Sequence, residues 1–124
     1  MIFGVGTDIV NVERIQQAVE RWGEQFLTRI FTPGEIDYCY KMRYPYPSLA
    51  ARFAAKEAFI KAIGAEIAVP LKEIEVVRSA NGQPLMHLHG KSRDFVGERR
   101  IGKIHLSLSH EADFGVAFVI MERD

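Results

Sequence analysis

Several features that would assign a class at once are missing from this chain of 124 residues. It holds one cysteine, Cys39, so an intrachain disulfide is excluded. No apolar run reaches the roughly 18 residues that a membrane span needs. The first residues, MIFGVGTD, lack the basic region and the apolar stretch of a signal peptide. We therefore expect a cytoplasmic protein that does not enter a membrane.

An excess of either charge is also missing. The chain has 16 basic and 16 acidic residues, which gives a formal net charge of zero. Simple nucleic-acid binding domains carry a basic excess, so we expect no nucleic-acid partner. The length and the 48% hydrophobic content fit one domain over residues 1–124 with a core of its own.

Two common catalytic motifs are absent as well. The sequence has no glycine-rich phosphate-binding loop of the P-loop type, which disfavours an unrelated magnesium-dependent nucleotide phosphotransferase or hydrolase. It has no G-x-S-x-G nucleophile elbow, which disfavours a serine hydrolase of that type. Any chemistry must come from a different set of residues.

The residue pattern predicts an α+β fold with a largely antiparallel sheet, a long central helix and several short helices. Apolar, β-branched or alternating segments predict strands over residues 2–10, 73–79, 85–89, 101–110 and 114–121. Of these, the first and the last are expected to be buried. Helical spacing predicts helices over residues 12–22, 33–42, 48–63 and 91–100, and a short helix or turn over 26–31. Asn11 is expected to cap the first helix, and Thr32 with Glu35 forms the capping box of the helix over 33–42. Asn81-Gly82 predicts the turn of a hairpin.

The predicted helix 48–63 has an unusual distribution of side chains. At about 100° per residue its alanines share one side, which predicts close packing on a sheet or another helix. Large apolar residues lie opposite, with Arg52, Lys56, Glu57 and Lys61 among or beside them. Surface helices normally keep charges away from large apolar residues, so we expect a cleft that holds all four charges. Alternatively, Glu57 and Lys61 form an exposed pair and the other two side chains extend to water.

Asp8 follows two glycines in the first predicted strand. Gly4, Gly6 and Asp8 share one face of an extended chain, and the glycines leave backbone open to a close approach. Asp8 could instead cap the following helix. If Asp8 and Glu57 meet, the two carboxylates beside basic side chains would suit Mg²⁺ and phosphate groups.

The segment Ser107-Leu108-Ser109-His110 ends another predicted strand. Alternation places Ser107 and Ser109 on one face, and His110 lies at the strand end, where ligands are often held. The serines could equally be ordinary strand positions that face solvent.

Taken together, these segments resemble the three motifs of the 4′-phosphopantetheinyl transferase family, in order and along essentially the whole chain. They are Gly6-Thr7-Asp8, residues 52–61 (RFAAKEAFIK) and residues 107–110. The chain length and the segment 31–35 (FTPGE) are similar to the small bacterial type of this family. The resemblance implies the fold of that family and a transferase activity.

The resemblance also implies a reaction and its partners. Such an enzyme moves 4′-phosphopantetheine from coenzyme A to a serine of an apo-acyl carrier protein, with Mg²⁺, and releases adenosine 3′,5′-bisphosphate. Its role is in fatty acid biosynthesis and lipid metabolism. The resemblance to the small type also implies a homotrimer with each active site at a subunit boundary.

The same resemblance assigns roles to residues. Asp8 and Glu57 are the expected Mg²⁺ ligands, and with Lys61 they are the expected catalytic residues. Glu57 is also the candidate base for the carrier serine. The residues expected to hold coenzyme A are Arg52, Lys56, Lys61, Ser109 and His110.

A carrier protein of this kind is acidic, so a basic docking surface is expected. Arg14 and Arg21 are seven residues apart on one side of the predicted first helix, and Arg29 follows in the next segment. The alternative is a solvated helix face in which acidic neighbours balance these arginines. A competing function for the whole chain is a module that binds coenzyme A or a carrier protein without chemistry.

Overall fold

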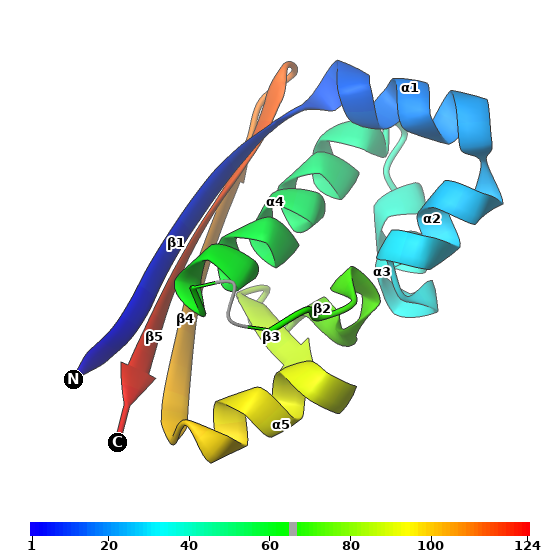
Figure 1. The fold of residues 1–124 in the computed structure, drawn as a ribbon. Helices are drawn as coiled ribbons and strands as arrows, with labels where there is room; N and C mark the ends of the chain where they lie inside the picture. Colours follow the sequence, from blue (N-terminus) through cyan, green and yellow to red (C-terminus); the bar gives the residue numbers. More distant parts are fainter. Residues whose placement is uncertain (65–66) are drawn as a thin grey trace.

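The computed structural model describes residues 1–64 and 67–124 and confirms the α+β fold class (Figure 1). In chain order its elements are β1 (Ile2–Asn11), α1 (Val12–Trp22), α2 (Glu24–Ile30), α3 (Pro33–Tyr40), α4 (Tyr46–Ala62), the 3₁₀ turn η1 (Leu71–Glu73), β2 (Ile74–Arg78), β3 (Pro84–Leu88), α5 (Gly90–Glu98), β4 (Ile101–His110) and β5 (Phe114–Arg123). All strand pairings among these residues are antiparallel.

The strands form a three-stranded sheet in the order β1-β5-β4 and a separate β2-β3 hairpin. β5 is central because a short turn after His110 returns the chain beside β4, and β1 then pairs with the free edge of β5. The hairpin loop contains Gly82 at φ +83°, a backbone conformation that favours glycine. The turn predicted at Asn81-Gly82 is therefore confirmed.

Helix α4 packs directly on the three-stranded sheet through its alanines. A Cβ atom built on Gly6 would lie 1.9 Å from the carbonyl oxygen of Ala58, and one on Gly4 would lie 2.0 Å from that of Ala62. On the central strand, a Cβ on Gly115 would lie 2.5 Å from the Ala51 nitrogen. The predicted packing of the alanine side is confirmed, and helix α4 is what approaches the glycines of β1.

Some local predictions are confirmed and others need correction. Asn11 caps α1 by accepting a hydrogen bond from the Arg14 nitrogen, and Thr32 and Glu35 form the capping box of α3. Helix α4 begins at Tyr46 rather than Ser48, because Pro47 is tolerated in the first turn of a helix.

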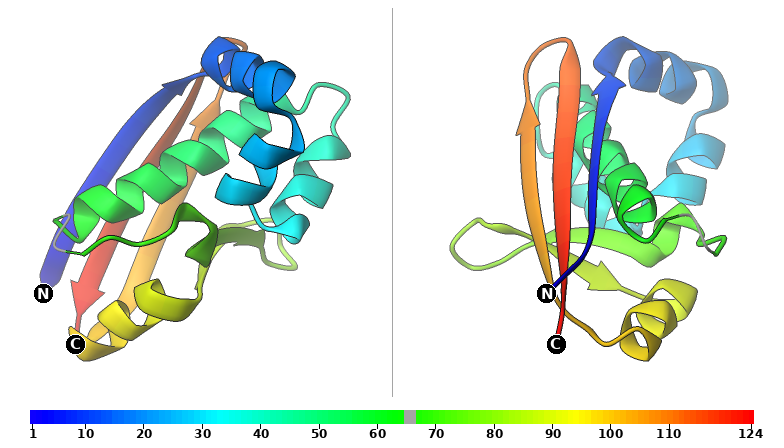
Figure 2. Two further views of the ribbon diagram at one scale, coloured as in Figure 1. Left: turned by 45° about the vertical axis from the view of Figure 1, so that its right-hand side comes forward. Right: turned by 60° about the vertical axis from the view of Figure 1, so that its left-hand side comes forward.

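The prediction that β1 and β5 are buried strands is wrong in part. Each strand has one face against α4 and one face that no described element covers, since all helices lie on one side of the sheet (Figure 2). On the open face Val5, Ile9, Phe114 and Phe118 are 43–62% exposed. No helix in the described ranges has the length and apolar character to cross a bilayer.

Candidate active site

The four charged residues of α4 lie in two different environments. Arg52 and Lys56 are buried, with 2% and 0% of their surface exposed, whereas Glu57 is half-buried and Lys61 is exposed. Residues one position apart on a helix point about 100° apart, which puts Lys56 and Glu57 on different sides of α4. The prediction of one cleft that holds all four charges is therefore wrong.

On the β1 side of α4, three predicted catalytic residues come together. The Lys61 Nζ donates hydrogen bonds to Asp8 Oδ1 and to the carbonyl oxygen of Thr7, each at 3.0 Å. Glu57 lies one turn before Lys61 on the same helix, and its carboxyl is close enough for the charge of Asp8 to affect it. The glycine-to-alanine packing of β1 on α4 makes this approach possible.

The Glu57 carboxyl is held in an environment that disfavours its charge. Burial, and then the negative charge of Asp8, raise the pKa of Glu57, while Lys61 lowers it by a smaller amount. Lys61 is bonded to Asp8 and leaves Glu57 without such a partner among the hydrogen bonds of the described residues. The two carboxylates, of which only Asp8 is bonded to Lys61, offer the oxygen ligands that Mg²⁺ prefers.

Asp8 and Glu57 open onto a groove between β1, α1 and α4. The groove is also lined by Arg14, Phe26 and Phe53. Phe26 belongs as well to an adjoining hollow beside Trp22 and Arg29. The carboxylates therefore lie at one end of a continuous surface that runs along α1 and α2.

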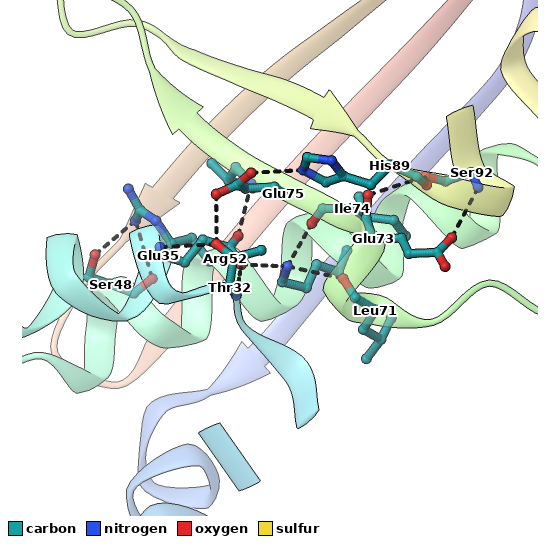
Figure 3. A network of polar contacts seen from close by, with 12 residues as sticks. Thr32, Glu35, Ser48, Arg52, Leu71, Glu73, Ile74, Glu75, His89 and Ser92 are labelled. Atoms are coloured by element: carbon teal, nitrogen blue, oxygen red, sulfur yellow. Dashed lines mark hydrogen bonds and ion pairs between the residues drawn. The ribbon is translucent and has the colours of Figure 1, made fainter. Parts of the chain in front are cut away.

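On the side of α4 that faces α3, Lys56 belongs to a buried network whose partners Glu35, Leu71 and Ile74 are labelled in Figure 3. Its Nζ donates to Glu35 Oε1 at 2.8 Å and to the carbonyl oxygens of Leu71 and Ile74 at 3.1 and 2.6 Å. Three contacts use all three N–H donors of an ammonium group, so Lys56 has none left for a phosphate. Its predicted role in binding coenzyme A receives no support from this geometry.

Glu35 completes this network from α3. Its Oε1 accepts from the Thr32 nitrogen and its Oε2 accepts from the Val76 nitrogen, in addition to the Lys56 contact. The Glu35–Lys56 pair, with both side chains 0% exposed, joins α3, α4, η1 and β2. Burial is the largest influence on Lys56 and lowers its pKa, against the opposing charge of Glu35.

Arg52 is buried but keeps an unused donor. Its Nη1 donates to Ser48 Oγ at 2.8 Å, and its guanidinium carbon lies 4.3 Å from the centre of the Tyr38 ring. The Arg52 Nε has no hydrogen-bond partner in the described part of the chain. Arg52 also lines a small groove between α3 and β2, beside Tyr38 and Arg78.

Ser109 and His110 lie on β4, which β5 separates from β1 and its Asp8. Ser109 is in register with Val116 and Ile9, on the open face, whereas Asp8 is in register with Ala117 under α4. His110 pairs with Gly115 at the end of β4, the strand at the other edge of the sheet from β1. One chain therefore does not bring these two residues to Asp8 and Glu57.

The three predicted docking arginines are all exposed. Arg14 lines the groove that contains Asp8 and Glu57, and Arg29 lines the adjoining hollow. Arg21 lies on α1 with its guanidinium carbon 4.9 Å from the centre of the Trp22 ring. Arg14 and Arg29 therefore line hollows that share Phe26, and Arg21 is seven residues from Arg14 on the same side of α1.

Comparison with known proteins identifies the family. The family model of the 4′-phosphopantetheinyl transferase superfamily matches residues 4–119. The chain belongs to this superfamily. A member of it is a transferase, so the predicted enzyme class is confirmed.

Individual relatives of the superfamily align over nearly the whole chain. A holo-[acyl-carrier-protein] synthase of Halothermothrix orenii is 45% identical over 123 residues, which is 98% of each chain. The crystal structure of the Neisseria meningitidis holo-[acyl-carrier-protein] synthase has a TM-score of 0.89 and 38% identity, over 99% of this chain and 100% of that one. The Helicobacter pylori enzyme, solved with coenzyme A, has a TM-score of 0.82 and 32% identity, over 95% and 99%.

The sequence did not point to two groups that the structure reveals in this transferase. Glu35 was expected only as a helix cap, and its ion pair with Lys56 was not foreseen. A second group, Glu75 with His87 and His89, gathers on the β2-β3 hairpin. The alternation of the two histidines and the hairpin register could have revealed it.

Proposed function

We propose that the chain is a holo-[acyl-carrier-protein] synthase that transfers 4′-phosphopantetheine from coenzyme A to a serine of apo-acyl carrier protein. Adenosine 3′,5′-bisphosphate is the second product, and the reaction supports fatty acid biosynthesis. The observation that carries the proposal is that Asp8 and Glu57 line one groove while Lys61 donates a hydrogen bond to Asp8. A cytoplasmic location stays a prediction.

The chemistry is phosphoryl transfer, which depends mainly on positioning and charge neutralisation. The serine oxygen forms a bond to phosphorus, and the bond from that phosphorus to the bridging pyrophosphate oxygen breaks. Asp8 and Glu57 would hold Mg²⁺, whose contribution is to neutralise charge on the pyrophosphate oxygens. Lys61 is 55% exposed and uses two of its three donors, so one remains for a phosphate oxygen.

Glu57 is our candidate for the group that accepts the serine proton. The support is its position: Glu57 lines the groove with Asp8 and lies one turn before Lys61 on α4. The proton moves from the serine hydroxyl to a Glu57 carboxylate oxygen as the new bond to phosphorus forms.

Coenzyme A binding is proposed for a second set of residues: Arg52, Ser109 and His110. Arg52 lines the groove between α3 and β2, which supports a phosphate contact by its guanidinium group. We leave Lys56 out of this set, since its three donors are already used within the protein.

We propose that the enzyme works as a homotrimer with each active site at a subunit boundary. The two sets of residues lie toward opposite edges of one sheet, and its open face carries exposed Val5, Ile9, Phe114 and Phe118. A closed cyclic assembly would cover this apolar face and bring the β4 edge of one chain to the β1 edge of the next.

The acidic carrier protein is proposed to dock on Arg14, Arg21 and Arg29. The support is that all three are exposed, and that Arg14 and Arg29 line the groove of the carboxylates and the hollow that adjoins it. Complementary charge of this kind raises the association rate and sets the orientation of the partner.

The test is to incubate the protein with coenzyme A, Mg²⁺ and an apo-acyl carrier protein, and to weigh the carrier by mass spectrometry. We expect the carrier to gain the mass of one phosphopantetheine group and to keep its mass when its serine is replaced by alanine. Binding of coenzyme A and carrier without any mass gain would contradict the proposal and favour a non-catalytic binding module.

A further inference from the structure

Three metal-binding side chains gather on one face of the β2-β3 hairpin. Glu75 of β2 is directly opposite His87 of β3 in the antiparallel register. His89 lies two residues beyond His87, and its backbone nitrogen donates to the Glu73 carbonyl, which extends the pairing past the end of β3. Residues two apart on a strand share a face, so both imidazoles point to the side of Glu75.

The three side chains are already close to one another. His89 Nε2 lies 2.9 Å from Glu75 Oε1, and the potential ligand atoms of the three residues all lie within 4.8 Å of one another. The His87 and His89 rings are stacked, with their centres 4.6 Å apart. Ligands of a tetrahedral Zn²⁺ ion are separated by about 3.3 Å, so rotation of the exposed imidazoles would bring them together.

The glutamate of this group is held in place from the α3 side. Thr32 Oγ1 donates to Glu75 Oε2 at 2.7 Å, which leaves Oε1 directed at the histidine (Figure 3). Thr32 therefore fixes the carboxyl from outside the group, and Oε1 stays available to a metal ion. Carboxylates that bind metals are themselves held by such outer hydrogen bonds.

We propose that Glu75, His87 and His89 form a binding site for a borderline first-row divalent cation such as Zn²⁺. Two imidazole nitrogens and one carboxylate oxygen are a ligand set that Zn²⁺ accepts, with a fourth position left for water or another group. The pair Asp8 and Glu57 differs because it offers only oxygen, the ligand of Mg²⁺. The site stands on its own geometry and does not depend on the proposed transferase function.

Binding at this site would fix the hairpin. The ligands join β2 to the end of β3, and Thr32 connects Glu75 to the start of α3. An ion that binds the folded chain more tightly than the unfolded one raises the stability of the fold. Zinc is therefore expected to raise the melting temperature through these side chains.

The experiment is a calorimetric titration of the full-length protein with ZnCl₂ in excess Mg²⁺, which occupies carboxylate-only sites. We expect one Zn²⁺ per chain in the wild type, with affinity reduced on the order of 10²-fold in His87→Gln and in His89→Gln. Both histidines are exposed, so their replacement is expected to leave the melting temperature without zinc unchanged.

His105→Gln is the matched control. Like His89, His105 contacts a carboxylate, in this case that of Glu122. We expect this variant to bind Zn²⁺ as the wild type does, and zinc to raise the melting temperature in the wild type and in His105→Gln but not in His87→Gln. Unchanged zinc affinity in His87→Gln and His89→Gln, or a loss confined to His105→Gln, would overturn the proposal.

Discussion

The two sides of helix α4 use the same residue types in opposite ways. On the β1 side, Glu57 and Asp8 line a groove, and Lys61, which is bonded to Asp8, is 55% exposed with a donor to spare. On the α3 side, Lys56 and Glu35 are 0% exposed and their hydrogen-bonding groups are used within the protein. A lysine–carboxylate pair can therefore serve a reaction only where burial and bonding partners leave some of its hydrogen-bonding groups free.

The largest effect on activity is expected from Glu57→Gln. The change removes a metal ligand and the proposed base but keeps the size of the side chain. We expect phosphopantetheine transfer to fall on the order of 10³-fold or more, measured as mass gain of the carrier over time. The melting temperature should stay near that of the wild type, and near-normal transfer would remove the two-carboxylate site from the account.

On the other side of the helix, Lys56→Met should act on stability. It leaves the buried Glu35 charge without its partner, so the free energy of unfolding should fall by about 3–5 kcal/mol, measured by denaturant titration. Adding Glu35→Gln removes the unpaired charge and should restore part of this loss, since the Gln side chain keeps one acceptor oxygen for the two backbone N–H groups, of Thr32 and Val76, that Glu35 accepts from. A double variant no more stable than Lys56→Met would show that the pair is not what stabilises this region.

A smaller effect is expected from Lys61→Met. The substitution keeps the apolar stem but removes the proposed phosphate contact and the hydrogen bond to Asp8. We expect kcat to fall roughly 10²-fold, since a charge that contacts the reacting phosphate acts mainly in the transition state. The same steady-state assay on Lys72→Met, an exposed lysine of η1, provides the control and should match the wild type.

The smallest of these effects is expected from reversing the docking charges. In the double variant Arg14→Glu, Arg21→Glu, kcat/KM for the carrier should fall about 10- to 100-fold because attraction becomes repulsion. Coenzyme A affinity, measured by calorimetry, should not change. A carrier kcat/KM equal to that of the wild type would place the docking surface elsewhere.

Local signals in the sequence predicted much of the fold. Asn11 and the Thr32–Glu35 box mark helix starts because capping depends on neighbours in the chain. The alanine side of α4 and the glycines of β1 predicted a close approach, which the structure confirms. The meeting of Asp8 with α4, which the pattern alone left open, follows from this packing.

Other features depend on tertiary contacts that no local pattern contains. The burial of Lys56 results from the placement of Glu35 and of the η1 carbonyls around it, all distant in sequence. One face of β1 and β5 is open because no element of the described residues covers it, although the apolar sequences of these strands suggested burial. The group of Glu75, His87 and His89 depends on hairpin register, which a glycine-containing turn suggests but does not fix.

The most direct measurement compares the transfer rate per folded molecule of Glu57→Gln and Lys56→Met, at a temperature where both are folded. Circular dichroism gives the folded fraction, and mass spectrometry of the carrier gives the rate. We expect folded Glu57→Gln to be almost inactive and folded Lys56→Met to transfer at a rate near that of the wild type. An active Glu57→Gln together with an inactive, fully folded Lys56→Met would contradict the assignment of the active site to the β1 side of α4.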